Sequence, residues 1–239
     1  MKNIIIITDL RGPDAQSLLS HLEETGWQVQ CVPESVCLWD EEALSKWAAP
    51  FSENLEAVVH PAPPAICGSV MDIAKADWGL ARDEGPMAAW CVAKVFGGIM
   101  REKRRGSLIF LNSIHAEKPV GMGYLFSMGC GAVQMLCREF NQDYGTANVR
   151  SFFVQRGISS DDPDLRSDVS NVYFGLDMRY PQRQVPSSGS LNGLISFLLT
   201  DEAWPLSGSD LRADGGMTMF YNHRSQMEGR DYFERLLKE

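Results

Sequence analysis

Six short apolar runs separated by helix-length segments are the feature that most constrains how this chain can fold. The runs predict strands at residues 3–8, 28–32, 55–60, 106–112, 149–154 and 209–213. The segments between and after them predict helices at residues 14–25, 40–49, 68–76, 78–102, 124–144, 190–200 and 229–238. Strands that alternate with helices pair in parallel, and the helices then cover both faces of the sheet. The sequence therefore predicts an α/β fold, with one doubly wound parallel sheet in a single domain over residues 1–239.

Charge and composition exclude several classes of partner. The 239 residues carry a formal net charge of −9, and phosphate backbones require a basic face, so no nucleic-acid partner is expected. No apolar run approaches the roughly 20 residues that cross a bilayer, and the chain opens directly into a strand, which predicts a cytoplasmic protein with no membrane association. The six cysteines form no C-x-x-C pair, so no metal site is predicted.

Three motifs stand in a fixed order along the second half of the chain. The apolar run from residue 106 ends at Ser113, at the carboxyl end of a predicted strand, where open α/β sheets place their chemistry. Phe126 follows thirteen positions later and opens a predicted helix. The run 207–216 then closes the sheet with the sequence Ser-Gly-Ser-Asp-Leu-Arg-Ala-Asp-Gly-Gly.

This order and spacing resemble the short-chain dehydrogenase/reductase family over nearly the whole chain. The resemblance implies a Rossmann-type fold, a lid-like loop at 158–189 and a carboxyl-terminal tail at 217–239. In the family a Ser holds the substrate carbonyl, a Tyr transfers the proton, and a Lys lowers the pKa of the Tyr and holds the nicotinamide ribose. Ser113 matches the Ser, but Phe126 and Cys130 stand in place of the Tyr and the Lys, and Gly85 stands in place of a further catalytic Asn. A phenyl ring has no proton to give and a thiol supplies no permanent positive charge, so the resemblance predicts a degenerate site.

The turn after the first strand departs from the family in the same direction. The family has Thr-Gly-x-x-x-Gly-x-Gly there, whose glycines let the backbone approach a pyrophosphate at a helix amino terminus. This chain retains a degenerate loop with Thr8, Asp9, Arg11 and Gly12, followed by Pro13, which has no N–H to donate. Asp9 places negative charge where a diphosphate would lie. We therefore expect this chain to hold no cofactor, although Arg11 and Gly12 could still bind an anion.

These replacements favour a pseudo-enzyme, a non-catalytic subunit that forms a hetero-oligomer with an active family member holding NAD. The helices at 78–102 and 124–144 keep large apolar faces, and the family assembles through such helices; a homo-oligomer is also possible. The pattern resembles the non-catalytic subunits of heteromeric family members, one group of which oxidises the hydroxyl of a phenyl-substituted succinyl-CoA thioester (2-[hydroxy(phenyl)methyl]-succinyl-CoA) in anaerobic toluene degradation.

Two alternatives remain open from the sequence. The first is an NAD(P)-dependent oxidoreductase with an altered active site. The second is a repurposed non-redox enzyme in which His115, with an unperturbed pKa of about 6.5, acts as a base beside Ser113 and Lys118. Halohydrin dehalogenases resemble this second case, because they keep the fold and have abandoned the nucleotide.

Overall fold

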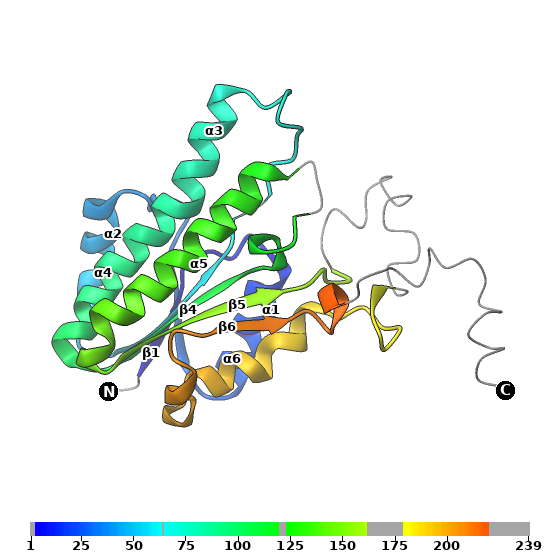
Figure 1. Ribbon diagram of the computed structural model, residues 1–239. Coiled ribbons are helices and arrows are strands. Elements are labelled where there is room, and N and C mark those ends of the chain that lie inside the picture. The colour runs from blue at the N-terminus through cyan, green and yellow to red at the C-terminus, as the bar shows by residue number, and fades with distance from the viewer. Residues whose placement is uncertain (1–2, 64, 120–122, 162–178, 220–239) are drawn as a thin grey trace, which may run out of the picture.

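A computed structural model describes residues 3–63, 65–119, 123–161 and 179–219. Their strands form one six-stranded parallel sheet in the order β2-β1-β3-β4-β5-β6, with helices packed on both faces (Figure 1). The chain passes from β1 to the edge strand β2, then crosses back over β1 to β3 and continues in that direction to β6, so the sheet is doubly wound as predicted.

The observed elements agree closely with most of the predicted ones. The strands are β1 Ile4–Ile7, β2 Gln28–Cys31, β3 Leu55–Pro61, β4 Gly106–Ser113, β5 Val149–Arg156 and β6 Asp210–Ala213. The helices are α1 Pro13–Glu24, α2 Glu41–Ala48, α3 Lys75–Arg82, α4 Ala88–Lys103, α5 Tyr124–Tyr144 and α6 Asn192–Leu198. Short 3-10 turns include η3 Ile114–Ala116 and η10 Met217–Met219, and η2 Asp83–Met87 is a π-helical segment. None of the described helices is long and apolar enough to cross a membrane.

Each face of the sheet carries its own apolar core. Helices α2, α4 and α5 cover one face, where Phe110 and Phe153 are fully buried, and helices α1 and α6 cover the other, where Ile5 and Phe152 are fully buried. Strands buried on both faces are typical of parallel sheets, and they explain why the predicted strands are almost continuously apolar.

The connection between β2 and β3 contains no strand. The residues from 32 to 54 form only α2 and a 3-10 turn, so β2 is the edge strand.

The predicted helix at 68–76 was wrong. Gly68 forms an isolated parallel bridge with Gly123, and the backbone then turns. The Ser69 hydroxyl bonds the Asp72 carboxylate and accepts the backbone N–H of Met71 at 3.3 Å. Side chains that satisfy the backbone locally in this way compete with helix formation. The helix begins only at α3.

The helix predicted at 78–102 begins earlier, at α3, and is interrupted by η2. Pro86 lies inside η2 and has no N–H to donate to the preceding turn. A single π-helical turn accommodates that missing bond and lets α4 continue.

The lid-like loop and the tail are only partly described. Tyr173, Phe174 and Met178 of the predicted lid and the predicted helix at 229–238 lie outside the described residues. Tyr180 is 1% exposed, and its hydroxyl donates to the Ile158 carbonyl at 2.6 Å. This end of the loop is therefore packed against the domain.

Candidate functional site

The carboxyl ends of β1, β3, β4 and β5 meet at one edge of the sheet, where a doubly wound fold places its ligands. The deepest pair there joins β1 to β3. Thr8 is 2% exposed and its Oγ1 lies 2.7 Å from Nδ1 of His60, which is 3% exposed. Burial lowers the pKa of His60 to about 4, so the imidazole is neutral near pH 7. Thr8, which the sequence assigned to the cofactor loop, is thus bonded within the protein.

Beside this pair, Arg11 is held by two carboxylates. Its guanidinium contacts both oxygens of Asp9, at 2.7 to 3.1 Å, and Oε2 of Glu84 in η2 at 3.0 Å. These contacts, of which the hydrogen bond to Asp9 is the largest, raise the pKa of Arg11. Two carboxylates around one guanidinium leave a net negative charge. The structure thus pairs Arg11 with two carboxylates of the protein.

The amino terminus of α1 is likewise paired. Asp14, in the first helical turn, is 8% exposed and lies 3.0 Å from Nε of Arg156 at the end of β5. Gly12 precedes the helix with an ordinary extended backbone, φ −99° and ψ 152°, and a Cβ built on it meets no atom within 4 Å. Neither the backbone conformation nor the neighbouring atoms require glycine here, in contrast to a turn through which a pyrophosphate passes.

Ser113, His115 and Phe126 lie together at the end of β4. The Ser113 hydroxyl lies 2.8 Å from Nδ1 of His115, and the same oxygen accepts the backbone N–H of His115 at 3.3 Å. The Phe126 ring meets the imidazole edge-on at 5.4 Å between centroids. Burial, and secondarily the nearby Arg156 cation, lowers the pKa of His115. A neutral His115 therefore bonds Ser113, with an apolar ring packed against it.

Cys130 lies one helical turn beyond Phe126 and is 3% exposed. Burial raises the pKa of its thiol to about 12, which the hydrogen bond with the Ser113 backbone only partly opposes. A buried neutral thiol is neither a nucleophile nor a cation at physiological pH. Gly85 is buried in η2, and a Cβ there would meet no atom within 4 Å. The assignment of these positions to the Tyr, Lys and Asn of the family stays a prediction.

Lys118, which the sequence grouped with Ser113 and His115, is exposed beyond η3. Its backbone N–H donates to the Ile114 carbonyl at 2.8 Å. Among the described contacts none brings its side chain to Ser113. The structure thus brings together only the first two members of the proposed group.

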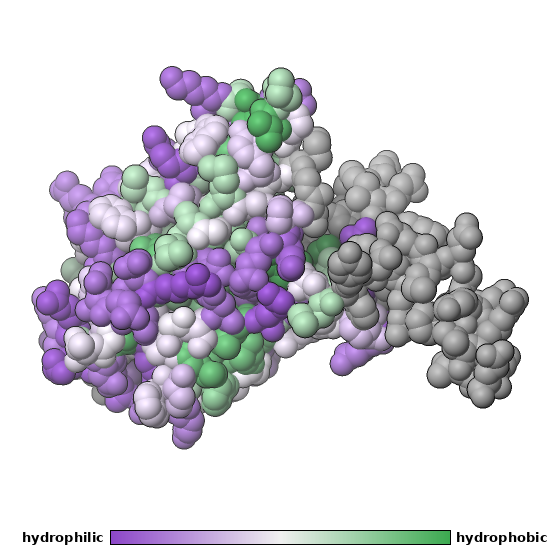
Figure 2. Space-filling model, viewed as in Figure 1, coloured by the Kyte–Doolittle hydropathy of each residue, from purple (hydrophilic) through white to green (hydrophobic). Residues whose placement is uncertain are grey.

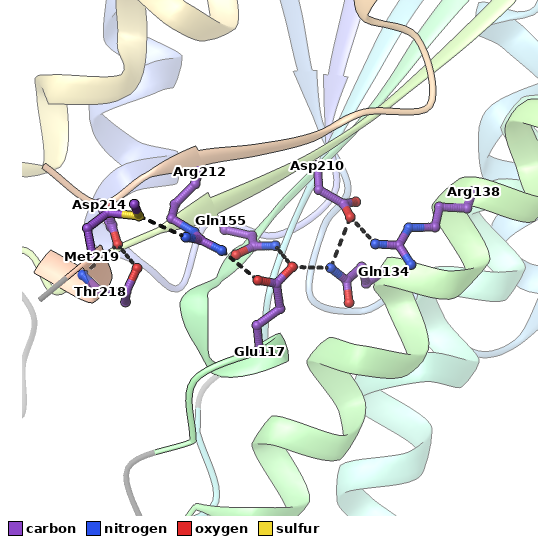
Figure 3. Close-up of polar contacts among 9 residues, drawn as sticks. All are labelled: Glu117, Gln134, Arg138, Gln155, Asp210, Arg212, Asp214, Thr218 and Met219. Atoms are coloured by element: carbon purple, nitrogen blue, oxygen red, sulfur yellow. Dashed lines mark hydrogen bonds and ion pairs between the residues drawn. The ribbon is translucent and has the colours of Figure 1, made fainter. Parts of the chain in front are cut away.

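A polar network that the sequence did not single out fixes the turn after Ser113 (Figure 3). Glu117 Oε1 accepts the side-chain amides of Gln134 on α5 and Gln155 on β5, each at 2.9 Å. Its other oxygen accepts from Arg212 on β6 at 2.6 Å. These bonds, led by that from Gln155, lower the pKa of Glu117. The carboxylate thereby joins three elements to the turn that carries His115.

Asp210 extends this network along β6, where it accepts from Gln134 at 3.1 Å and from Arg138. Its other oxygen is buried without a partner among the described residues. Farther along, Asp214 accepts from the backbone N–H groups of Gly216 and Thr218 and from the Thr218 hydroxyl. The closing Asp-Gly-Gly run thus holds η10 against the sheet. The partners of Glu117 and Asp210 lie 17 to 95 positions away along the chain, so no local sequence pattern reveals them.

Comparison with known proteins bears on the whole chain. The family model described as Enoyl-(Acyl carrier protein) reductase matches residues 6–218. A tropinone reductase homologue of Arabidopsis thaliana is 18% identical over 184 residues, which are 75% of this chain and 66% of that protein. The 3-oxoacyl-[acyl-carrier-protein] reductase MabA of Mycobacterium tuberculosis is 25% identical over 131 residues, 55% of this chain and 53% of MabA. The chain thus matches between 53% and 66% of these relatives' lengths.

Solved structures share the fold. ElxO with NADP bound superposes with a TM-score of 0.82 at 14% identity, covering 92% of this chain and 100% of ElxO. An ElxO variant with a tyrosine replaced by phenylalanine, with NADPH bound, gives the same TM-score at 15% identity and the same coverage. At these identities the similarity establishes the architecture and leaves the chemistry to the residues described above.

Proposed function

Because the chain belongs to the short-chain dehydrogenase/reductase family, we propose that it is a non-catalytic member that assembles with an active homologue of the same fold. The observation that carries the proposal is the neighbourhood of Ser113. Phe126 packs against His115 there, and the neutral thiol of Cys130 bonds the Ser113 backbone. No phenol and no ammonium group adjoins Ser113 among the described contacts, so the proton transfer of the family has no donor.

We also propose that the partner, and not this chain, holds the nucleotide. The carboxylates around Arg11 support this part of the proposal. The ElxO variant holds NADPH with a phenylalanine in place of a tyrosine, so that exchange alone does not abolish cofactor binding in this fold. The expectation of no bound nucleotide rests instead on Asp9 and Glu84, which surround Arg11, and on Asp14, which is paired with Arg156. NAD bound in an active partner would supply the hydride acceptor.

Helices α4 and α5 offer a surface for such a partner. Met87 before α4, Trp90 on α4 and Met135 on α5 are 37%, 43% and 51% exposed. Other apolar residues of the same two helices are instead buried in the core, namely Val92, Phe96, Val133 and Phe140. Apolar side chains lie among polar ones over α3, α4 and α5 (Figure 2), a mixture that is common in interfaces between separately folded subunits.

Assembly is tested by co-expression with an encoded homologue that carries the Ser, Tyr and Lys. We expect both chains in one particle by native mass spectrometry, and we expect Trp90→Asp with Met135→Asp to dissociate it. Met71→Asp is the control, since Met71 is 89% exposed in the turn before α3. A particle containing only copies of this chain would contradict the heteromeric form. Saturable NAD(P)H binding with alcohol turnover by the isolated chain would overturn the proposal.

The narrower form of the proposal, in which the partner oxidises a hydroxyl of a CoA thioester, rests on the pattern of replaced residues alone. It is tested with the assembled particle. The expected result is NAD reduction with 2-[hydroxy(phenyl)methyl]-succinyl-CoA and none with the free acid. Equal rates with simple alcohols would contradict it.

The bond between Ser113 and His115 supports a second candidate, a non-redox reaction with neutral His115 as the base. The same oxygen also accepts the His115 N–H and caps η3, so the contact has a structural role as well. Ester hydrolysis by the isolated chain, lost in both Ser113→Ala and His115→Asn, would establish this candidate. Hydrolysis that survives either substitution would exclude it.

A further inference from the structure

The described end of the lid-like loop, residues 179–189, is held to the domain by a single aromatic side chain. Tyr180 is 1% exposed and packs with Ile114 of η3 and Met217 of η10 in a small apolar cluster, distinct from the two cores of the sheet. Its hydroxyl donates to the Ile158 carbonyl, at the start of the same loop, at 2.6 Å. A buried phenol needs such an acceptor, so ring and hydroxyl together join both ends of the loop to the carboxyl edge of the sheet.

The two glycines of the closing Asp-Gly-Gly run make room for this end of the loop. A Cβ on Gly215 would lie 3.0 Å from Cδ1 of Tyr180, and a Cβ on Gly216 would lie 3.1 Å from Cγ of Pro181. Both glycines also have a positive φ, 61° and 81°, which other residues rarely adopt. A Cβ on Gly157, which follows β5, would likewise lie 3.3 Å from the Tyr180 hydroxyl oxygen. Residues without a side chain thus let the tyrosine approach the ends of β5 and β6 closely.

Backbone hydrogen bonds also join the two ends of the loop to each other. The Ser160 N–H donates to the Pro186 carbonyl at 2.9 Å, and the Ser188 N–H donates to the Asp161 carboxylate at 2.9 Å. All of these partners belong to the chain itself. The two ends of the loop are therefore linked by bonds that exist only while residues 158–161 and 180–188 stay together.

We propose that Tyr180 anchors the end of the lid-like loop to the carboxyl edge of the sheet and that this anchor does not require a bound nucleotide. Burial of the ring and the hydrogen bond of the hydroxyl both favour the anchored position. Neither interaction involves a charged group, so neither depends on an anionic cofactor. Because the anchor lies within one chain, it is independent of the proposed assembly.

Hydrogen–deuterium exchange of the full chain, followed by mass spectrometry, tests the anchor. The reporters are peptides that contain Ser160 and Ser188, whose N–H groups bond across the two ends of the loop. Tyr180→Ala removes the ring, and we expect both amides to exchange at least tenfold faster while the amides of β5 stay protected. Unchanged exchange would overturn the proposal. Equal acceleration in β5 would also overturn it, because the tyrosine would then support the whole domain.

Two further variants separate the hydroxyl from the ring and control for the loss of a tyrosine. Tyr180→Phe keeps the ring and removes only the bond to Ile158, so we expect a smaller acceleration, about two- to tenfold. If Tyr180→Ala does not fold, unchanged exchange in Tyr180→Phe would overturn the proposal. Tyr144→Ala is the matched control, since Tyr144 stacks on Phe140 at the carboxyl end of α5, with 4.4 Å between ring centroids. We expect no change in the two reporter peptides there, and equal acceleration would contradict the role of Tyr180.

Addition of NADPH to the wild-type chain tests whether the anchor needs a nucleotide. We expect the exchange of the Ser160 and Ser188 peptides to be unchanged, and slower exchange with NADPH would overturn the proposal. Saturable NADPH binding with unchanged exchange would instead contradict the proposed function and leave the anchor intact. The two proposals therefore fail by different results.

Discussion

The faces of the sheet and its carboxyl edge are stabilised in different ways. On the faces, apolar side chains such as Phe110 and Ile5 are completely buried against the helices. At the edge, charged side chains from distant segments pair with one another, as Arg11 does with Glu84, 73 positions away, and Arg212 with Glu117, 95 positions away. The faces therefore depend on nondirectional burial, and the edge depends on specific partners.

This difference explains how the architecture of the family can persist while the residues at its carboxyl edge change. Apolar burial tolerates many sequences as long as the volume and the pattern are kept. At the edge, groups that could meet a ligand are instead satisfied by the protein, as Arg11 and Asp14 are. The structure keeps the sheet that positions a site, while the polar groups in it are committed to each other.

A substitution in the face core gives the largest expected effect. Phe110→Ala should lower the free energy of unfolding by about 3–5 kcal/mol, because it leaves a cavity under α2, α4 and α5. Urea denaturation measures it. Trp204→Ala, at a side chain that is 69% exposed, should stay within about 0.5 kcal/mol. Similar decreases in the free energy of unfolding of the two variants would show that burial against the face of the sheet contributes no more than an exposed side chain does.

Acid should weaken the edge through His60. The pKa of His60 is about 4 in the folded protein and about 6.5 in the unfolded chain. Between these two pH values the unfolded chain therefore binds a proton at His60 that the folded protein does not bind. The free energy of unfolding then falls by up to about 3 kcal/mol as pH drops from 6.5 to 4. Above pH 6.5, His60 adds no further pH dependence. His60→Asn, which keeps a polar group toward Thr8, should remove that part of the slope.

The measurement is urea unfolding of both proteins at several pH values from 4 to 8. The quantity of interest is the difference between the two curves, because the other titrating groups, including His115, are common to both. A difference that does not vary with pH would show that His60 has the same pKa in the folded protein as in the unfolded chain.

The sequence predicted the faces of the sheet better than its carboxyl edge. The strands and five of the helices could be predicted, because burial imposes a periodic pattern on each segment. The helix at 68–76 was wrong, since the Ser69 side chain bonds both the Asp72 carboxylate and the Met71 backbone. The π-helical turn also escaped prediction, although Pro86 was a visible sign of a break.

The sequence predicted which residues lie in the site only where their spacing along one segment places them there. The placement of Phe126 and Cys130 beside Ser113 follows from their spacing on one helix. The partners of Arg11, and the network around Glu117, depend on segments that only the folded sheet brings together. The sequence accordingly left open that Arg11 could bind an anion, whereas the structure pairs it with two carboxylates.

The Glu117 network should give a moderate effect. Glu117→Gln replaces an acceptor oxygen with an amide donor that faces Gln155, Gln134 and Arg212, so unfolding should become easier by about 1–2 kcal/mol. Glu139→Gln, at an exposed position on α5, is the control and should change little. Thermal and urea unfolding measure both variants. Equal effects would mean that the bonds drawn in Figure 3 add nothing beyond surface charge.

The smallest effect on stability is expected at Arg11. The informative result there is the binding of an anion by a variant that lacks the two carboxylates. The side chain is 41% exposed, so Arg11→Gln should cost no more than about 1 kcal/mol. Asp9→Asn with Glu84→Gln should leave stability similarly unaffected but release the guanidinium at the amino-terminal side of α1. Pyrophosphate should then bind the double variant and not the wild-type chain, in a titration followed by calorimetry. Pyrophosphate binding to the wild-type chain would show that the carboxylates do not close the edge, and it would remove the electrostatic argument against a bound nucleotide.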